Sequence, residues 1–300
     1  MKILAVTLGR CSGCSIMIDG KIEYAVSEEK FSRIKSDESY PKHSIDHALD
    51  FCKITPNQLD KIIIAGNRIA IIPPLLRVYT KFSVKDHLKM MEDYWYPKLI
   101  KNESISMLDV FRDRIDLDRY PLNQPFVSEL DFETIEHPVT QESDEKISKF
   151  FKKALSNHLG ISDEKVIHIE HDTCHAAYGF YGSTIRDDNT LIFTADAWGD
   201  DLSGTISVYD KENQCIKRLK EYSHKDFQLA RLYRYTTLLL HMIPNEHEYK
   251  VMGLAPYYTG NKTQEVENIF DKMLQLDGLD FKFNSEIKDI YQHLKENLDE

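Results

Sequence analysis

The chain contains the same order of short apolar segments twice, and this repetition limits the folds open to it more than any other feature. The first set of strand-length segments is Lys2–Thr7, Cys14–Asp19 and Lys21–Ser27, and the second set is Leu191–Ala195, Gly204–Tyr209 and Cys215–Tyr222. Asp19-Gly20 is a strong signal for a hairpin turn. Apolar residues at helical spacing follow each set, after Pro41 in the first case and over Phe227–His241 in the second. We therefore expect an α/β protein with an internal structural duplication.

The segments outside the repeat complete the expected organisation. We predict strands at Lys61–Ala65 and Val166–Glu170, and helices at Ser143–His158, Thr173–Tyr181, Gln264–Leu276 and Ile287–Leu298. Residues 67–140 fit the pattern poorly, with one expected helix over Lys85–Leu99, and are interpreted as an insertion that carries substrate- or partner-specific surface. The chain stops at Glu300 without a further strand. We expect a first domain over 1–185, the start of an incomplete second domain over 186–300, and a fragment of a longer protein.

Composition and charge narrow the classes of partner. The 38 Lys and Arg residues against 49 Asp and Glu residues leave a formal charge of -11, which opposes binding to nucleic acid and to anionic lipid. No segment has the length or apolarity of a secretory signal or a membrane span. Five scattered cysteines, with Cys11 and Cys14 as the one C-x-x-C pair, suit reduced thiols in the cytoplasm.

Two histidines and one aspartate are candidate metal ligands. His171 and His175 are four residues apart where an expected strand passes into a helix, so both imidazoles face the same side. Asp196 ends the strand that opens the second repeat. Two imidazoles and a carboxylate form the arrangement that divalent iron and some other metals use. The alternative is a turn aspartate with two half-buried histidines. His43 and His47 have the same spacing, and we interpret them as a solvated helix face.

Small and hydroxyl residues make two loops candidate phosphate sites, because their backbone amides can surround phosphate oxygens. The loops are Gly9–Ser15 and Asp196–Gly204, and their candidate residues are Gly9, Ser12, Gly13, Gly199, Asp200, Ser203 and Gly204. Turn formation explains the same residues equally well. Arg33 and Lys35 are candidates for binding an anion, with a solvated surface as the alternative. Glu248–Tyr257 combines charge, aromatic rings and glycine after a helix, which predicts a loop.

Five of these segments together resemble the O-carbamoyltransferase family of antibiotic and nodulation-factor biosynthesis. In the family's order they are Asp19–Ile22, Glu28–Lys35, His171–Ala177, Thr194–Asp200 and Glu248–Tyr257. The last reads Glu-Tyr-Lys-Val-Met-Gly-Leu-Ala-Pro-Tyr and is long and specific; Glu248, Lys250 and Gly253 within it have no assigned role. The repeat itself is similar to the duplicated actin-like, ribonuclease H-like fold of the sugar kinase superfamily. In that fold the first loop of each half faces a nucleotide.

The resemblance implies a two-step reaction. A carboxy-terminal YrdC-like domain, absent here, makes carbamoyl adenylate from carbamoyl phosphate and ATP, and the amino-terminal domain transfers the carbamoyl group to a hydroxyl of a small-molecule or sugar-containing metabolite. It further implies a divalent metal, iron by resemblance, on His175 and Asp196 with His171 beside them, and carbamoyl phosphate near Lys35.

Two departures from the family leave a second function open. The family's Gly-His-Asp-x-Ser is replaced by Gly9-Arg10-Cys11-Ser12-Gly13, and its Asp-Gly after the second strand is Asp196-Ala197. The alternative is therefore an inactive nucleotide-binding sensor or scaffold on the same fold. A sugar or acid kinase fits the fold but not the Glu248–Tyr257 motif.

Overall fold

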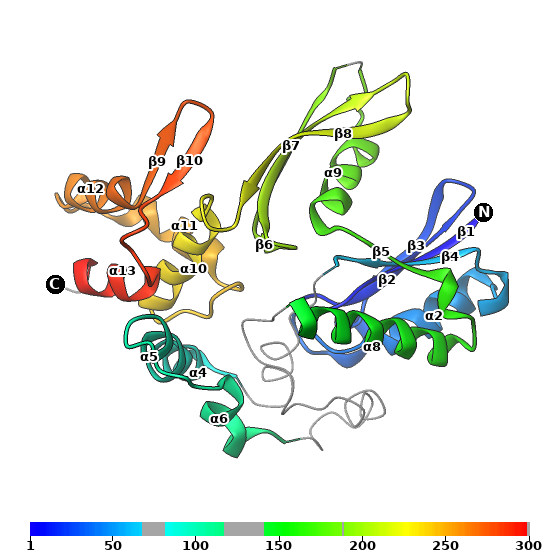
Figure 1. The fold of residues 1–300 in the computed structure, drawn as a ribbon, viewed down its shortest axis with the longest axis horizontal. Helices are drawn as coiled ribbons and strands as arrows, with labels where there is room; N and C mark the ends of the chain where they lie inside the picture. The colour runs from blue at the N-terminus through cyan, green and yellow to red at the C-terminus, as the bar shows by residue number, and fades with distance from the viewer. Residues whose placement is uncertain (68–81, 117–140, 188, 299–300) are drawn as a thin grey trace. The chain divides into compact units, whose positions relative to one another are not determined.

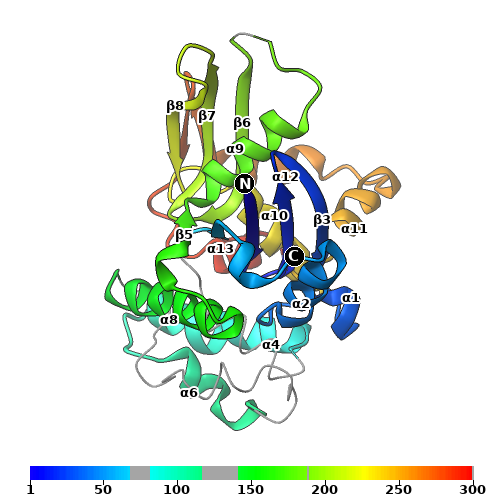
Figure 2. The same ribbon diagram turned by 90° about the vertical axis from the view of Figure 1, so that its right-hand side faces the viewer.

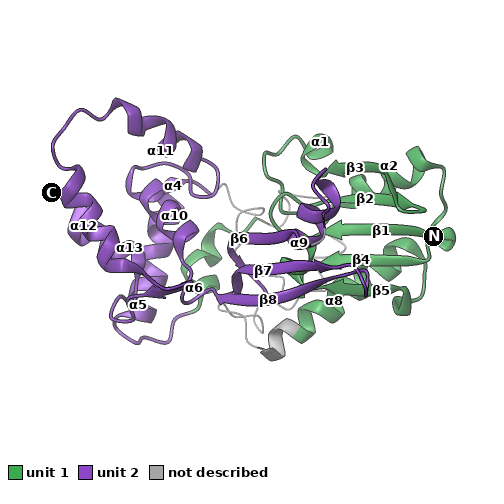
Figure 3. Cartoon of the chain, turned by 90° about the horizontal axis from the view of Figure 1, so that it is seen from above, with its two compact units in different colours: residues 1–81, 106–174 green, residues 82–105, 175–300 purple. Residues whose placement is uncertain are grey.

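A computed structural model describes residues 1–67, 82–116, 141–187 and 189–298 (Figure 1). The chain forms two compact units, coloured separately in Figure 3. The first contains residues 1–81 and 106–174, and the second contains residues 82–105 and 175–300. The mixture of sheets and helices confirms the α/β class. In the described parts of the chain, none of the helices has both the length and the apolarity needed to cross a membrane.

The first unit is built on one five-stranded sheet of order β3-β2-β1-β4-β5. Its strands are β1 (Lys2–Thr7), β2 (Gly13–Ile18), β3 (Lys21–Ser27), β4 (Lys61–Ala65) and β5 (Val166–Ile169). The first three form the predicted antiparallel meander, and β4 and β5 run parallel to β1. Asp19 and Gly20 both have positive φ, which confirms the predicted hairpin turn. Leu4, Ile16 and Ile62 are fully buried in the core of this sheet.

Helices α2 (Lys42–Cys52) and α8 (Gln141–Leu159) lie on one face of the sheet (Figures 1 and 2). The helical segments are α1 (Glu29–Ser32), α2 (Lys42–Cys52), α6 (Met107–Phe111), α8 (Gln141–Leu159) and the short turns η1 (Pro56–Gln58), η3 (Arg112–Arg114) and η7 (Asp163–Lys165). Helix α2 packs on β2 and β3, and α8 packs on β5. Pro41 lies directly before α2, as predicted, whereas α8 begins at Gln141 and not at Ser143.

The second meander is a separate three-stranded sheet of order β6-β7-β8. Its strands are β6 (Leu191–Gly199), β7 (Leu202–Asp210) and β8 (Cys215–Ser223), which confirms the three predicted segments. Helix α9 (His171–Gly182) packs on this sheet, because Ala176 and Phe180 form one buried cluster with Ile192. The division between the units falls inside α9, after Cys174.

The rest of the second unit is mostly helical. Its elements are α4 (Val84–Lys89), the π-helical segment η2 (Met90–Trp95), α5 (Tyr96–Leu99), α10 (Leu229–Leu239), α11 (Glu248–Leu254), η8 (Ala255–Tyr257), α12 (Thr263–Met273), β9 (Leu274–Asp277), β10 (Asp280–Phe283) and α13 (Ile290–Leu298). Leu232, Met273 and Leu294 share one core. Segment 84–99 is the helix predicted inside the insertion, whose parts at 68–81 and 117–140 lie outside the described residues.

Two predictions for this region are wrong. The segment after α12 is a hairpin, β9–β10, and not the end of a helix, because Gly278 has φ +65 and permits a tight turn. The Glu248–Tyr257 motif is α11 followed by a 3-10 turn and not a loop. Apart from Gly253 and Pro256, its residues permit a helix, and Glu248 accepts a hydrogen bond from the backbone N–H of Asn245 at its start.

Candidate metal centre

A bulge in β6 determines where Asp196 lies. Ala195 pairs with Gly204 and Gly199 pairs with Leu202, so the three residues Asp196, Ala197 and Trp198 lie opposite one residue of β7. The hydroxyl of Ser203 donates to the carbonyl oxygen of Ala197 at 3.1 Å and closes the bulge. A bulge interrupts the regular alternation of side chains between the two faces of a strand. The Asp196 side chain therefore departs from the direction that regular alternation would give it.

The start of α9 determines where the two histidines lie. Glu170 precedes the helix, and its Oε2 accepts hydrogen bonds from the backbone N–H of Thr173 at 2.8 Å and from the Thr173 hydroxyl at 2.6 Å. This capping satisfies a backbone donor that the first turn would otherwise leave without a partner. The helix consequently begins at His171, so that His171 and His175 are one turn apart on the same face.

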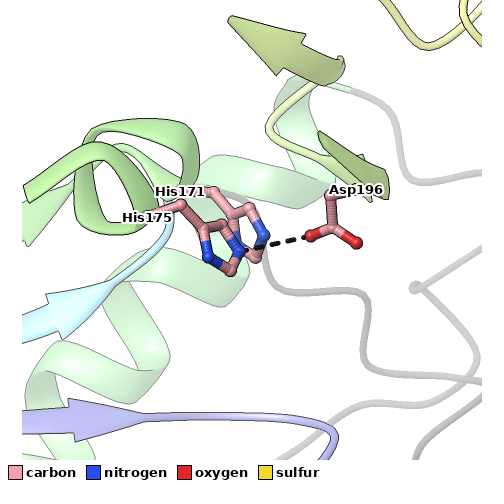
Figure 4. Close-up of side chains that lie close together, drawn as sticks. All are labelled: His171, His175 and Asp196. Carbon is pink, nitrogen blue, oxygen red and sulfur yellow. Dashed lines mark ion pairs between the residues drawn. The ribbon is translucent and has the colours of Figure 1, made fainter. Parts of the chain in front are cut away.

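The structure brings the three predicted ligands together. One ligand atom from each of His171, His175 and Asp196 lies within 4.8 Å of the other two, and Figure 4 shows both imidazoles next to the carboxylate. The distance from Nε2 of His175 to Oδ2 of Asp196 is 3.4 Å, and these side chains are 50% and 32% exposed. Two imidazole nitrogens and one carboxylate oxygen are a suitable donor set for a divalent transition metal, and the exposure leaves access for further ligands.

Several predicted phosphate-loop residues have structural roles. A Cβ on Gly204 would lie 2.6 Å from the carbonyl oxygen of Thr194, and a Cβ on Gly13 would lie 2.5 Å from that of Val26. These contacts are shorter than real Cβ atoms make, so both glycines are needed for close approach of neighbouring strands. Ser203, whose hydroxyl holds the bulge, is fully buried. At the β6–β7 turn, Gly199 precedes Asp200, which has φ 51.

The first loop lies against the segment that carries Arg33 and Lys35. The backbone N–H of Ser12 donates to the carbonyl oxygen of Asp37 at 2.9 Å, and the N–H of Glu28 donates to that of Ser12 at 2.8 Å. Gly9, at φ +90, precedes this contact, while Arg33 and Lys35 are both exposed. The Ser12 hydroxyl is buried and has no hydrogen-bond partner among the described residues. The predicted phosphate loop and the predicted anion-binding segment are therefore neighbours.

Comparison with known proteins fits this arrangement. The family model for the carbamoyltransferase N-terminus matches residues 2–298. The chain belongs to this family. An uncharacterized protein of Synechocystis sp., sll1178, is 24% identical over 269 residues, which cover 88% of this chain and 35% of that protein. This carbamoyltransferase N-terminus thus spans about a third of the length of the curated relative it matches.

Other predicted residues of this carbamoyltransferase N-terminus lie on a different element from the three ligands. Glu248, Lys250 and Gly253 are on α11, where Lys250 Nζ lies 5.9 Å from the centre of the Tyr249 ring. Tyr249 is 66% exposed and Tyr257 is 80% exposed. The most specific motif of the sequence therefore forms an exposed helical segment with accessible aromatic side chains.

The interpretation of His43 and His47 as a solvated face is wrong for His43. Its Nδ1 lies 2.6 Å from Oε1 of Glu28, a carboxylate that is 1% exposed. Glu28 also accepts the backbone N–H groups of His43 at 3.2 Å and Ser44 at 2.9 Å. Sequence reasoning missed this role because Glu28 lies in a charged run, where burial of one carboxylate leaves no local signal. His47 is exposed, as predicted, and its Nδ1 lies 3.0 Å from the Tyr24 hydroxyl.

Proposed function

We propose that this chain is the amino-terminal, metal-binding part of an ATP-dependent O-carbamoyltransferase. In this proposal the carbamoyl group passes from carbamoyl phosphate, through carbamoyl adenylate, to a hydroxyl of a small-molecule or sugar-containing metabolite. The observation that carries the proposal is the meeting of His171, His175 and Asp196 in a chain that belongs to the carbamoyltransferase N-terminus family. The carboxyl-terminal partner is a YrdC-like domain that makes the adenylate.

The three ligands suit a divalent metal, which we propose is iron. A metal bound there would supply electrostatic stabilisation of charge that develops on the carbamoyl oxygen during transfer. The role of the protein is to hold the donor atoms at one point. The capped start of α9 orients the two imidazoles, and the β6 bulge turns the carboxylate towards them.

The transfer step itself is an acyl substitution. The acceptor hydroxyl oxygen forms a bond to the carbamoyl carbon, the bond from that carbon to the phosphate oxygen breaks, and adenosine monophosphate leaves with the electron pair. The proton of the acceptor hydroxyl passes to water, so the products are the carbamoyl ester, adenosine monophosphate and one proton. We propose that loops Gly9–Ser15 and Asp196–Gly204 bind nucleotide phosphates, and that Arg33 and Lys35 bind carbamoyl phosphate. The Ser12 contact with Asp37, which joins the first loop to that segment, supports this assignment.

The proposed function includes a duplicated actin-like fold, with one lobe at 1–185 and the second from 186 onwards. Support comes from the two meanders with the same connections, β1-β2-β3 and β6-β7-β8. In the first unit β4 pairs with the outer edge of β1. The described residues place no strand on the corresponding edge of β6, where Leu191 and Phe193 are 56% and 67% exposed. An apolar strand of this kind suits pairing with a further strand and cover by a helix.

The alternative, an inactive nucleotide-binding sensor or scaffold, is favoured by one observation. Arg10 and Cys11 replace the polar pair expected beside the bound anion, and Cys11 has φ 56 in an exposed turn. A sensor binds nucleotide without consuming it. A steady-state assay of carbamoyl phosphate consumption by the full-length protein therefore separates the two functions.

Metal analysis of the full-length protein tests the proposed centre. We expect one divalent metal per chain in the wild type, and loss of both metal and carbamoyl transfer in His175→Ala and in Asp196→Ala, with the fold retained because both side chains are partly exposed. His47→Ala is the matched control, since it removes an exposed helical histidine, and it should keep both properties. Equal metal content in all four proteins would refute the centre.

A further inference from the structure

Helix α10 carries two arginines on adjacent positions of one side. Arg231 and Arg234 are three residues apart, so their side chains leave the helix as neighbours. Leu232 and Leu238 on the same helix belong to two different buried clusters, and Tyr235 packs against both. The two arginines therefore lie at the margin of the packed surface and not on an isolated solvent face.

Arg231 is half-buried, and among the described residues no carboxylate forms an ion pair with its guanidinium. Burial has the largest effect on the pKa of Arg231 and lowers it; Tyr235 opposes this shift, and the positive charge of Arg234 makes the smallest contribution, which lowers the pKa further. Among the described residues, neither guanidinium donates a hydrogen bond or forms an ion pair. Arg234 lies 5.7 Å from the centre of the Tyr235 ring, as a cation–π contact. A partly desolvated cation without an acceptor is costly for a folded protein.

Other arginines of the chain have a carboxylate partner or are solvated by water. Arg112 pairs with Asp109 at 3.1 Å, and Arg218 pairs with Glu221 at 3.0 Å. Arg33 needs no such partner, because it is exposed and water can solvate it. Among the described residues Arg231 and Arg234 have no such carboxylate, which leaves both guanidinium groups able to accept a counter-charge from a bound anion.

We propose that Arg231 and Arg234 bind a phosphoryl group. A phosphate dianion neutralises two guanidinium charges, whereas a single carboxylate would leave one of them uncompensated. The planar N–H fork of arginine also matches the spacing of phosphate oxygens. The ligand is free phosphate or the phosphate of a nucleotide. This site is distinct from the His171, His175 and Asp196 cluster and does not depend on the proposed carbamoyl transfer.

Calorimetric titration of the full-length protein with inorganic phosphate, AMP and ATP tests the proposal. We expect binding of at least one probe, and a loss of affinity of about ten-fold to a hundred-fold in Arg231→Gln and in Arg234→Gln, because each removes a charged donor. Arg218→Gln is the matched control, since its guanidinium already has Glu221, and it should bind like the wild type. A loss of affinity for inorganic phosphate in the two arginine variants identifies a free-phosphate site; a loss for AMP or ATP, with phosphate not bound, identifies a nucleotide site.

A second measurement separates ligand binding from folding. We expect phosphate or the effective nucleotide to raise the melting temperature of the wild type and of His175→Ala by more than that of Arg231→Met, which keeps only the other proposed phosphate sites. In ligand-free buffer Arg231→Met should melt no lower than the wild type, because it replaces an uncompensated charge by an apolar side chain of similar length. The proposal is wrong if no probe binds the wild type, or if the arginine variants bind and melt like it.

Discussion

Glu28 acts as a cap for a helix that begins fourteen residues later in the chain than Glu28 itself. Its buried carboxylate accepts hydrogen bonds from both backbone and side chain of His43 and of Ser44, at distances from 2.6 to 3.2 Å. These donors lie in the first turn of α2, where backbone N–H groups have no partner within the helix. Glu28 thus joins the end of β3 to the start of α2.

We predict that Glu28→Ala lowers the free energy of unfolding by about 3 kcal/mol, because it leaves several buried donors without an acceptor. Chemical denaturation of the purified protein measures the loss. Glu23→Ala is the control, since Glu23 is 37% exposed and pairs with Lys21 at the surface. The capping role would be refuted if the two variants lost equal stability.

Gly204 and Gly253 differ in the space available for a side chain. A Cβ at Gly204 would meet the Thr194 carbonyl oxygen at 2.6 Å, whereas a Cβ at Gly253 would meet no atom within 4 Å. We predict that Gly204→Ala destabilises the protein by about 1–3 kcal/mol through overcrowding between β6 and β7. Gly253→Ala should leave stability unchanged or raise it by up to about 1 kcal/mol, since alanine favours a helix over glycine. Thermal unfolding compares the two, and an equal loss in both would contradict the steric explanation.

At the scale of elements, the local pattern predicts most strands and helices, and errors occur at their ends. All five strands of the first sheet and all three of the second lie where the sequence places them. The alternation of apolar and polar residues depends only on residues close along the chain, so the sequence alone is enough to predict these strands. The sequence does not predict the β9–β10 hairpin, because Leu276 continues the apolar spacing of the preceding helix. In the structure Leu276 is in β9 and is 72% exposed.

Helix α13 carries a pH-dependent cap. Oδ1 of Asp289 accepts a hydrogen bond from the backbone N–H of Gln292 at 3.1 Å, while its buried Oδ2 has no hydrogen-bond partner in the part of the chain that the structure describes. Burial raises the pKa of Asp289 above 3.8, and hydrogen bonds from the backbone of Gln292 and Tyr291 oppose this rise. The folded state therefore holds the proton more tightly than the unfolded state does. The stabilisation is present below pH 3.8 and is lost as pH rises through the raised folded pKa.

We predict that Asp289→Asn removes this contribution to the pH dependence. At neutral pH the variant should be at least as stable as the wild type, because it keeps the capping oxygen and has no charge to desolvate. Denaturation of both proteins at a series of pH values above about 4 measures the difference in free energy of unfolding. A difference that stays constant across the series would exclude Asp289 as its source.

At the scale of the whole molecule, the proposed reaction needs more than this chain. The carbamoyltransferase N-terminus family accounts for residues 2–298, and the match with the curated relative covers 35% of that protein. We predict that residues 1–300 alone produce no adenosine monophosphate from ATP and carbamoyl phosphate, because the resemblance assigns adenylate formation to the YrdC-like domain. A chromatographic assay for the nucleotide checks this. Appreciable product from the isolated chain would overturn the division of the two steps.

The sequence by itself determined the kinds of element and the chemistry of the candidate ligands. Apolar periodicity predicted both meanders, and the i, i+4 spacing predicted that His171 and His175 share a helix face, because each depends on residues close along the chain. The motifs likewise indicated the family that the comparison confirmed.

Tertiary structure alone decided which distant residues meet. The β6 bulge that brings Asp196 to the histidines depends on a pairing between two strands, and the same is true of the steric need for Gly204. The capping role of Glu28 and the electrostatic environment of Arg231 depend on burial. Burial of a charge is set by everything packed around it, so a charged residue in sequence does not reveal whether water, a partner or a ligand will neutralise it.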